Sequence, residues 1–293
     1  MSFAAMEIAS QPDCWQQASQ LAGETGSLVE QGERTAIVGC GTSWFVAQAI
    51  AALRESRGHG ESDAFAASEM PLDRSYDSVI VLTRSGTTTE ILRLVEQLNS
   101  KIRTVAVTAD GHSPVVEAVQ RAIVLDFADE RSVVQTRFAT TALALFRALL
   151  GEDLRPVVED AQDALEVPLP DPALAADQLT FLGAGWTVGL AQEAALKCRE
   201  ASRSWTEAYP AMEYRHGPIS ISTKGRVVWM FGTVPDGLDR QVFDTGAELI
   251  TSTGDPMADL VRAQRVAVAR AEAFGLDPDQ PRHLARSVIL QQD

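Results

Sequence analysis

A run of hydroxyl side chains in the first half of the chain is suited to binding an anion. Thr83–Thr89 reads Thr-Arg-Ser-Gly-Thr-Thr-Thr, so five hydroxyls, one guanidinium and a glycine fall within seven residues. The run follows an apolar segment and opens a helical one, and N–H groups at a helix start favour negative charge. A capping box at Thr87-x-x-Glu90 accounts for one or two of these hydroxyls, but not for five. We therefore predict a phosphate site on the Thr83–Thr89 run.

A second turn in the same half carries further donors. Gly39–Ser43 reads Gly-Cys-Gly-Thr-Ser, so Gly41, Thr42 and Ser43 open another helix. In open α/β sheets ligands bind beyond the carboxyl ends of the strands, where two such turns converge. The glycine pair alone is weak evidence because any tight strand–helix turn favours glycine. The full G-x-G-x-x-G pattern is absent, which disfavours a dinucleotide.

The second half carries candidates for proton transfer. Glu193, Lys197 and Glu200 are spaced by four and three residues, so they share one helix face. Spacing alone is equally typical of an exposed, salt-bridged face. The neighbours are largely alanine and leucine, however, and a partly buried carboxylate beside a lysine is one way to tune a general base.

A histidine in the second half is the other candidate for proton transfer. His216 precedes Gly217-Pro218, which indicates a loop, and loops on a rigid scaffold often carry function. A surface or capping histidine explains the same pattern. Histidine is, even so, the side chain best suited to proton transfer near pH 7.

The elements that must position these residues recur at half the chain length. Ile37–Gly41 and Phe181–Gly185, 144 positions apart, are each an apolar run and a Gly-x-Gly turn before an Ala-rich segment. This order is typical of the start of a βαβ unit, so we predict two α/β halves, each a parallel sheet with helices on both faces. Further strands are predicted at Val79–Thr83, Thr104–Thr108, Ala122–Leu125, Val227–Phe231 and Glu248–Ile250, and helices at Phe3–Val29, Trp44–Arg54, Thr89–Asn99, Pro114–Gln120, Thr136–Leu150, Val157–Leu165, Val188–Ser202 and Met257–Phe274. The acidic, proline-bearing stretch Gly151–Pro172 is the predicted linker, which gives domains of residues 1–155 and 156–293.

Composition narrows the class of protein. Forty acidic residues against 25 basic ones give a formal charge of −15, which disfavours nucleic acid as a partner. Neither a membrane span nor a signal peptide is expected. Three unpaired cysteines fit a reducing compartment, so we expect a cytoplasmic protein. The four histidines lack metal-ligand spacing, and we predict no metal and no cofactor.

Together these motifs resemble the sugar isomerase (SIS) family, above all double-SIS proteins such as the isomerase half of glucosamine-6-phosphate synthase. The likeness runs along nearly the whole chain. It is carried by Glu7–Pro12, Gly39–Ser43, Thr83–Thr88, Glu130–Arg137, Glu193–Glu200, Glu213–Pro218 and Leu284–Val288. The resemblance implies two flavodoxin-like SIS subdomains.

The resemblance also implies roles by position. Val133 and Ala285 fall where main-chain groups hold the sugar. The positions that fall where the family binds sugar phosphate are Ser43, Thr83, Arg84, Ser85 and Thr88. Glu200 falls at the base that moves a proton between C1 and C2, with Lys197 beside it. His216 falls at a histidine that assists ring opening and is often lent by a neighbouring subunit. A homodimer with shared active sites is therefore expected.

Two departures from the synthases bear on the reaction. No glutaminase segment precedes residue 1, so we expect that glutamine is not the ammonia source within this chain. Arg286 stands where the synthases carry lysine, and a guanidinium does not readily form an imine. Arg84, where synthases have glutamine, and Arg215–Pro218 look more like free-standing isomerases and amino-sugar-phosphate deaminases.

These observations predict a phosphosugar isomerase that acts on a hexose or hexosamine 6-phosphate by aldose–ketose proton transfer. The same enolamine chemistry suits an amino-sugar-phosphate deaminase or a fructosamine-phosphate deglycase. A non-catalytic phosphosugar-binding regulator is the alternative of another class. The predicted partner is a small sugar phosphate, with neither nucleic acid nor membrane.

Overall fold

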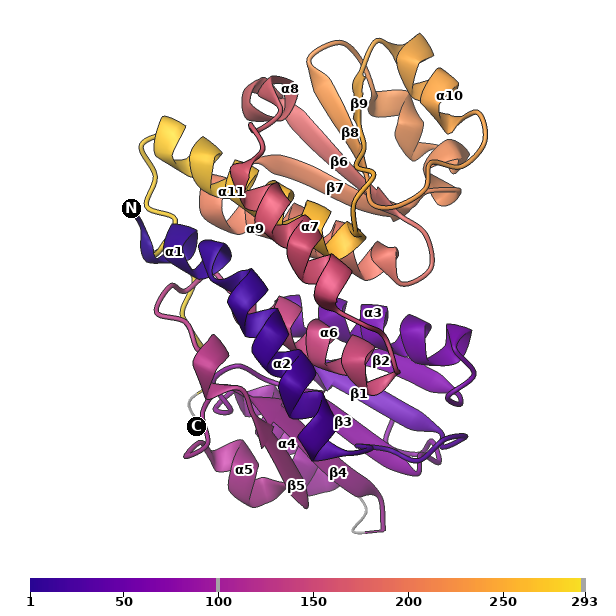
Figure 1. The fold of residues 1–293 in the computed structure, drawn as a ribbon, viewed down its shortest axis with the longest axis vertical. Helices are drawn as coiled ribbons and strands as arrows, with labels where there is room; N and C mark the ends of the chain where they lie inside the picture. The colour runs from indigo at the N-terminus through magenta and orange to yellow at the C-terminus, as the bar shows by residue number, and fades with distance from the viewer. Residues whose placement is uncertain (99–100, 291–293) are drawn as a thin grey trace.

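Two parallel sheets organise the molecule. The computed structural model describes residues 1–98 and 101–290. Within these residues a five-stranded sheet has the order β2-β1-β3-β4-β5 and a four-stranded sheet has the order β7-β6-β8-β9 (Figure 1). The first order is that of flavodoxin-like folds, and the second sheet follows it through four strands. The strands are β1 (Thr35–Gly39), β2 (Ser62–Ala66), β3 (Ser78–Leu82), β4 (Arg103–Thr108), β5 (Arg121–Val124), β6 (Gln178–Gly183), β7 (Trp205–Pro210), β8 (Arg226–Met230) and β9 (Glu248–Ile250).

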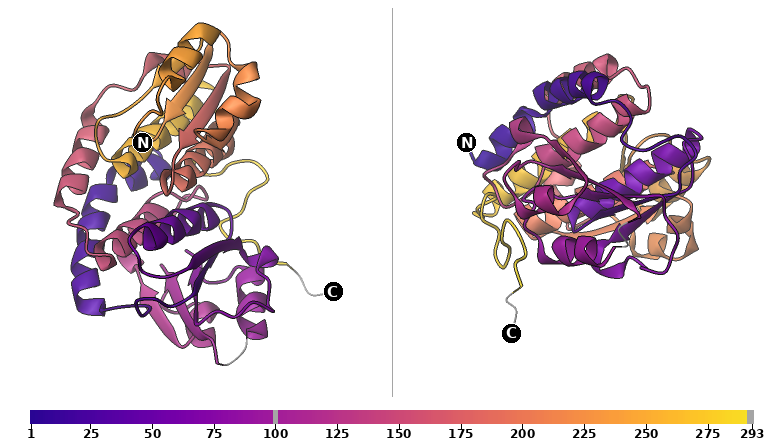
Figure 2. Two further views of the ribbon diagram at one scale, coloured as in Figure 1. Left: turned by 90° about the vertical axis from the view of Figure 1, so that its right-hand side faces the viewer. Right: turned by 90° about the horizontal axis from the view of Figure 1, so that it is seen from below.

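The longer helices lie between the two sheets, and shorter helices cover the outer faces (Figures 1 and 2). The inner helices are α2 (Gln11–Thr25), α3 (Thr42–Ser56), α6 (Arg137–Leu149), α7 (Arg155–Glu166), α9 (Thr187–Ser202) and α11 (Pro256–Ala273). The outer ones are α4 (Thr89–Gln97) and α5 (Pro114–Ala118) on the first sheet and α10 (Leu238–Thr245) on the second, while α1 (Phe3–Ala9) and α8 (Asp171–Ala175) are short.

The burial pattern explains this layering. Side chains alternate across each strand, so Ile80 and Leu82 of β3 join the central core while Val79 and Val81 pack under α4 and α5. One central apolar core continues through the inner helices from the first sheet to the second. Strands buried on both faces read as apolar runs, which is why they were visible in the sequence.

The two halves meet where α3 packs against α9. The backbones approach so closely that a Cβ placed on Gly189 of α9 would lie 2.4 Å from the Phe45 carbonyl oxygen and 3.0 Å from the Ala49 Cβ of α3. Small residues on both helices permit this approach. The contact fixes Thr42, at the start of α3, relative to α9.

Most predicted elements are present, but one predicted helix is divided and four elements were not predicted. The predicted helix at Phe3–Val29 is wrong as one run: α1 and α2 part at Ser10, and α2 ends at Thr25 because Gly26 has a positive φ of 67°. The helix predicted at Thr89–Asn99 begins at Thr89, and Asn99 lies outside the described residues. β2, β7, α8 and α10 were not predicted, because the two strands carry charged or half-exposed residues and the two helices are short.

The chain after α11 returns to the first half (Figure 2). Asp279 accepts hydrogen bonds from the N–H groups of Phe3 and Ala4, at 2.8 and 2.7 Å, and its carbonyl accepts one from Val133 N–H at 2.9 Å. Val288 then accepts a hydrogen bond from Thr89 N–H at 3.1 Å.

The domain boundary at 155/156 stays a prediction. Among the described residues, no helix has the length and apolarity needed to cross a membrane.

Candidate active site

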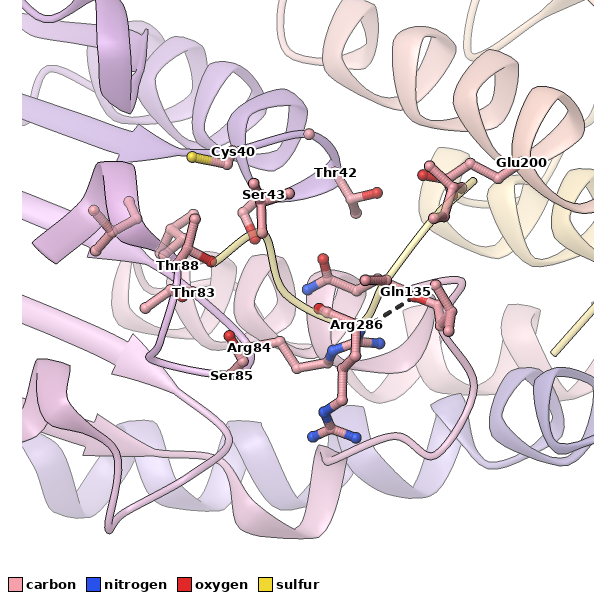
Figure 3. A pocket seen from close by; sticks show the side chains of 17 residues that line it. Cys40, Thr42, Ser43, Thr83, Arg84, Ser85, Thr88, Gln135, Glu200 and Arg286 are labelled. Atoms are coloured by element: carbon pink, nitrogen blue, oxygen red, sulfur yellow. Dashed lines mark hydrogen bonds between the residues drawn. The ribbon is translucent and has the colours of Figure 1, made fainter. Parts of the chain in front are cut away.

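A cavity of about 190 Å³ lies at the carboxyl ends of β1 and β3. Val38 pairs with Val81 in the parallel ladder, so the turns after these two strands begin side by side. Five segments line the cavity: Cys40–Ser43, Leu82–Ser85 with Thr88 and Ile91, Val133 with Gln135, Glu200, and Leu284–Arg286 with Val288 (Figure 3). Gly41, Thr42, Ser43, Thr83, Arg84, Ser85, Thr88, Val133, Glu200, Ala285 and Arg286, all predicted from the sequence, are among these lining residues.

The hydroxyl-rich loop, Thr83–Thr88, is a tight turn that leads into a helix, a geometry suited to an anion. Gly86 has a φ of 63°, and a Cβ there would lie 2.0 Å from the Ser113 hydroxyl oxygen, so the tight turn requires glycine. The loop then opens α4, whose N-cap is Thr88. The capping box considered at Thr87-x-x-Glu90 is not formed, because the N-cap is Thr88 and the Thr87 hydroxyl donates to those of Ser85 and Ser287. The Thr88 hydroxyl makes no capping hydrogen bond either. Its hydroxyl lies 3.4 Å from that of Ser287 and faces the cavity.

Arg84 lines the cavity, but its guanidinium is bound to other protein groups. The side chain is 5% exposed and donates to a Glu130 carboxylate oxygen at 3.1 Å. It also donates to the carbonyl oxygens of Ser132, Val133 and Arg286, each at 3.2 Å. A buried guanidinium needs such partners. Arg84 thus ties the hydroxyl-rich loop to two other walls of the cavity, and a direct bond from Arg84 to a ligand stays a prediction.

Arg286 also turns its charge away from the cavity. Its guanidinium donates to the Glu130 carbonyl oxygen and forms an ion pair with Asp129. Figure 3 shows the side chain directed away from Glu200. The main chain and side-chain stem of Arg286 therefore contribute to the wall, while its charged end does not.

Glu200 stands at the opposite end of the cavity from the hydroxyl-rich loop (Figure 3). It lies on α9, and its side chain is 19% exposed. One carboxylate oxygen pairs with the ammonium of Lys197, one turn earlier. Lys197 is 1% exposed and does not line the cavity; it donates to the Thr42 hydroxyl at 2.9 Å. The structure thus brings Lys197, Glu200 and Thr42 together across the two halves.

Glu193 completes this buried cluster. Its carboxylate lies 3.9 Å from the Lys197 ammonium and accepts from the Thr42 hydroxyl at 3.2 Å. Complete burial raises the pKa of Glu193 to about 8, against the opposing effect of Lys197. Burial would lower the pKa of Lys197, but the carboxylates of Glu193 and Glu200 outweigh it and raise that pKa. Lys197 therefore stays cationic beside Glu200 at neutral pH.

His216 lies apart from this cavity. It ends a short 3-10 helix, Glu213–His216, after β7, is exposed, and is absent from the cavity lining. Its predicted contribution from a neighbouring subunit stays a prediction.

Gln135 is a lining residue that the sequence reasoning missed. The stretch from Ser132 to Thr136 alternates between buried and partly exposed residues, and Val133 and Gln135 share the side that lines the cavity. The period-two position of Gln135 relative to Val133 was the available signal.

Known proteins resemble this chain in sequence. Residues 27–150 match the family model described as SIS domain. Glutamine–fructose-6-phosphate aminotransferase (isomerizing) from Sulfurisphaera tokodaii is 26% identical over 304 residues, covering 90% of this chain and 51% of that protein. The enzyme of the same name from Bacteroides thetaiotaomicron is 26% identical over 317 residues, with coverages of 88% and 52%. The chain thus spans about half the length of the curated relatives it matches.

Solved structures share the whole fold. Glucosamine-6-phosphate deaminase from Thermotoga maritima aligns with a TM-score of 0.83 at 24% identity, over 99% of this chain and 100% of that one. Tagatose-6-phosphate ketose/aldose isomerase from Escherichia coli aligns with a TM-score of 0.77 at 20% identity, over 99% and 97%. The predicted family resemblance and the predicted α/β fold class are confirmed.

Proposed function

Because residues 27–150 match the SIS domain model, we propose that the protein is a phosphosugar isomerase that moves a proton between C1 and C2 of a hexose or hexosamine 6-phosphate. One observation carries this proposal. A single cavity holds a hydroxyl-rich helix start at one end and a carboxylate paired with a buried lysine at the other. A phosphosugar needs both features at once, an anchor for its phosphate and a base at the far carbons.

The phosphate would be held mainly by neutral donors. Among the described residues near the cavity, the charged groups of Arg84, Arg286 and Lys197 are paired with carboxylates. The hydroxyls of Ser43, Ser85 and Thr88 and the N-terminal N–H groups of α4 remain to bind the phosphate oxygens. These groups act at short range, which suits a chain whose net charge of −15 repels anions at a distance.

Glu200 would act as the base. With the phosphate on the loop, C1 and C2 of the open-chain sugar extend toward Glu200, which removes a proton from one carbon and returns it to the other. Lys197 holds the carboxylate in place and offsets charge that develops on the sugar oxygens. His216, from a second subunit, would open the ring. Arg286, with its guanidinium turned to Asp129, supplies no amine for a covalent imine.

The same enolamine chemistry would also suit a deaminase or a deglycase, and the reaction products distinguish these enzymes from an isomerase. An isomerase interconverts ketose and aldose phosphates without releasing nitrogen. A deaminase releases ammonia from a hexosamine phosphate, and a deglycase releases an amine from its conjugate. A regulator would bind sugar phosphates and convert none of them.

The phosphate anchor is tested by replacing Ser85 and Thr88 together with alanine. Each hydrogen bond to a charged group contributes roughly 1.5–3 kcal/mol, so the dissociation constant of fructose 6-phosphate should rise at least about tenfold. Titration calorimetry measures it. Thr253→Ala in the second half, remote from this cavity, is the matched control and should bind as the wild type does. Unchanged affinity in the double variant would refute the assigned anchor.

A further inference from the structure

Gln135 carries a buried hydrogen-bond donor that no described group satisfies. Its side-chain amide nitrogen is shielded from solvent and has no hydrogen-bond partner among the described residues. The residue lines the cavity, and Figure 3 shows the amide end directed into it. Leaving a buried donor unpaired costs free energy, so native proteins keep few such groups and each one calls for an explanation.

Hydrogen bonds on both sides of Gln135 fix its backbone, and this defines the direction in which its side-chain amide extends. Glu130, whose side chain is fully buried, accepts hydrogen bonds from the N–H groups of Thr136 and Arg137, both just after Gln135. On the other side Val133 N–H donates to the Asp279 carbonyl at 2.9 Å. Glu7 of α1 holds the start of the segment by accepting from the Ser132 hydroxyl and N–H.

The position of the amide within the cavity defines what it contacts. In Figure 3 it lies between Ser43 and Thr88 on one side and Glu200 on the other. A hexose 6-phosphate anchored at one end and presented to Glu200 at the other places its C3 and C4 hydroxyls over this stretch. We propose that Gln135 is a specificity-determining residue that donates a hydrogen bond to a hydroxyl oxygen on C3 or C4 of the substrate.

This inference rests on the proposed function and narrows its substrate class. The substrate carries an oxygen acceptor midway between its phosphate and its reacting carbons. A site built to bond a hydroxyl discriminates strongly against an analogue that lacks it, because the site group is then left unpaired. The inference therefore predicts poor binding of a 3-deoxy or a 4-deoxy sugar phosphate.

The test compares three kinds of probe: inorganic phosphate, fructose 6-phosphate, and the 3-deoxy and 4-deoxy forms of fructose 6-phosphate. Gln135→Met keeps the length of the side chain and removes its donor, and Gln135→Ala removes both. Gln16→Met, on the exposed face of α2, is the matched control. Dissociation constants are measured by calorimetry for the wild type and each variant.

Wild type should bind fructose 6-phosphate roughly ten- to a hundredfold more tightly than one of the deoxy forms. Gln135→Met and Gln135→Ala should lose that preference while binding inorganic phosphate as wild type does, which also shows that they are folded. The Gln16→Met control should keep the preference.

Two results would overturn the inference, and only the second would also overturn the proposed function. If wild type binds fructose 6-phosphate and the Gln135 variants keep its preference for the hydroxylated sugar, Gln135 does not read the hydroxyl and the proposed function stands. If wild type binds neither inorganic phosphate nor any of the sugar phosphates, the proposed function fails and this inference fails with it.

Discussion

Glu193 and Glu200 lie two turns apart on α9, yet the protein surrounds them differently. Glu193 is fully buried between Lys197, Thr42 and Gln264, while Glu200 reaches the cavity. Lys197 lies between the two carboxyl groups. The inner carboxyl therefore serves to fix the lysine, and the lysine in turn fixes the outer carboxylate that faces the cavity.

The raised pKa of Glu193 predicts a pH-dependent stability. Its folded pKa of about 8 exceeds the unfolded value, so the folded state binds more protons between about pH 4.5 and 8, and the free energy of unfolding falls as pH rises through that range. Glu193→Gln removes this contribution. Urea titrations at pH 5 and pH 8 should show wild type losing at least about 1 kcal/mol more than Glu193→Gln between the two. Parallel pH profiles would contradict the assigned pKa shift.

At the scale of elements, the site depends on the contact between α3 and α9. α3 begins at Thr42 and α9 carries Lys197 and Glu200, so the packing of these two helices sets the distance across the cavity. The repeated Gly-x-Gly turns and Ala-rich segments predicted both helices from sequence. The close approach at Gly189 was not predictable, because the sequence does not show which glycine faces another backbone.

Gly189→Ala should therefore damage both stability and function. Its Cβ would meet the Phe45 carbonyl oxygen at 2.4 Å, and overpacking of this kind typically costs about 1–3 kcal/mol. Gly23→Ala in α2 is the control, since no atom lies within 4 Å of its added Cβ and alanine favours a helix. Chemical denaturation should show the first variant destabilised and the second unchanged or stabilised. If the two variants have the same free energy of unfolding, the close approach of α3 and α9 at Gly189 does not contribute to stability as we expect.

Site residues that belong to one short motif could be predicted from the sequence. Contacts between residues that are distant in the sequence could not. The Thr83–Thr88 loop and Glu200 were visible as motifs, and both line the cavity. The internal pairing of Arg84 with Glu130 was not foreseen, because nothing local shows that a guanidinium is paired with a carboxylate 46 residues away. Gln135 was missed because a single glutamine has no motif of its own, and its period-two position relative to Val133 was the one signal that could have indicated it.

At the scale of the whole molecule, the exposed position of His216 bears on assembly. His216 lies outside the cavity lining of its own chain, so a role in ring opening requires a second copy. Mixing inactive Glu200→Gln subunits with inactive His216→Ala subunits should restore about one quarter of wild-type activity, since half of the dimers are mixed and each mixed dimer has one intact site. No recovery, despite subunit exchange confirmed by mass spectrometry, would show that the sites are not shared.

Glu200 is the group that we propose to move a proton between C1 and C2 of a sugar phosphate. The most direct measurement is deuterium incorporation at these carbons, followed by NMR, for a panel of hexose and hexosamine 6-phosphates in D₂O. Wild type should exchange the proton of at least one of these sugars. Glu200→Gln, which keeps the shape but removes the base, should bind that sugar yet exchange it about 10²–10⁴-fold more slowly. Exchange at the wild-type rate in Glu200→Gln, or no exchange with any sugar in wild type, would contradict the claim.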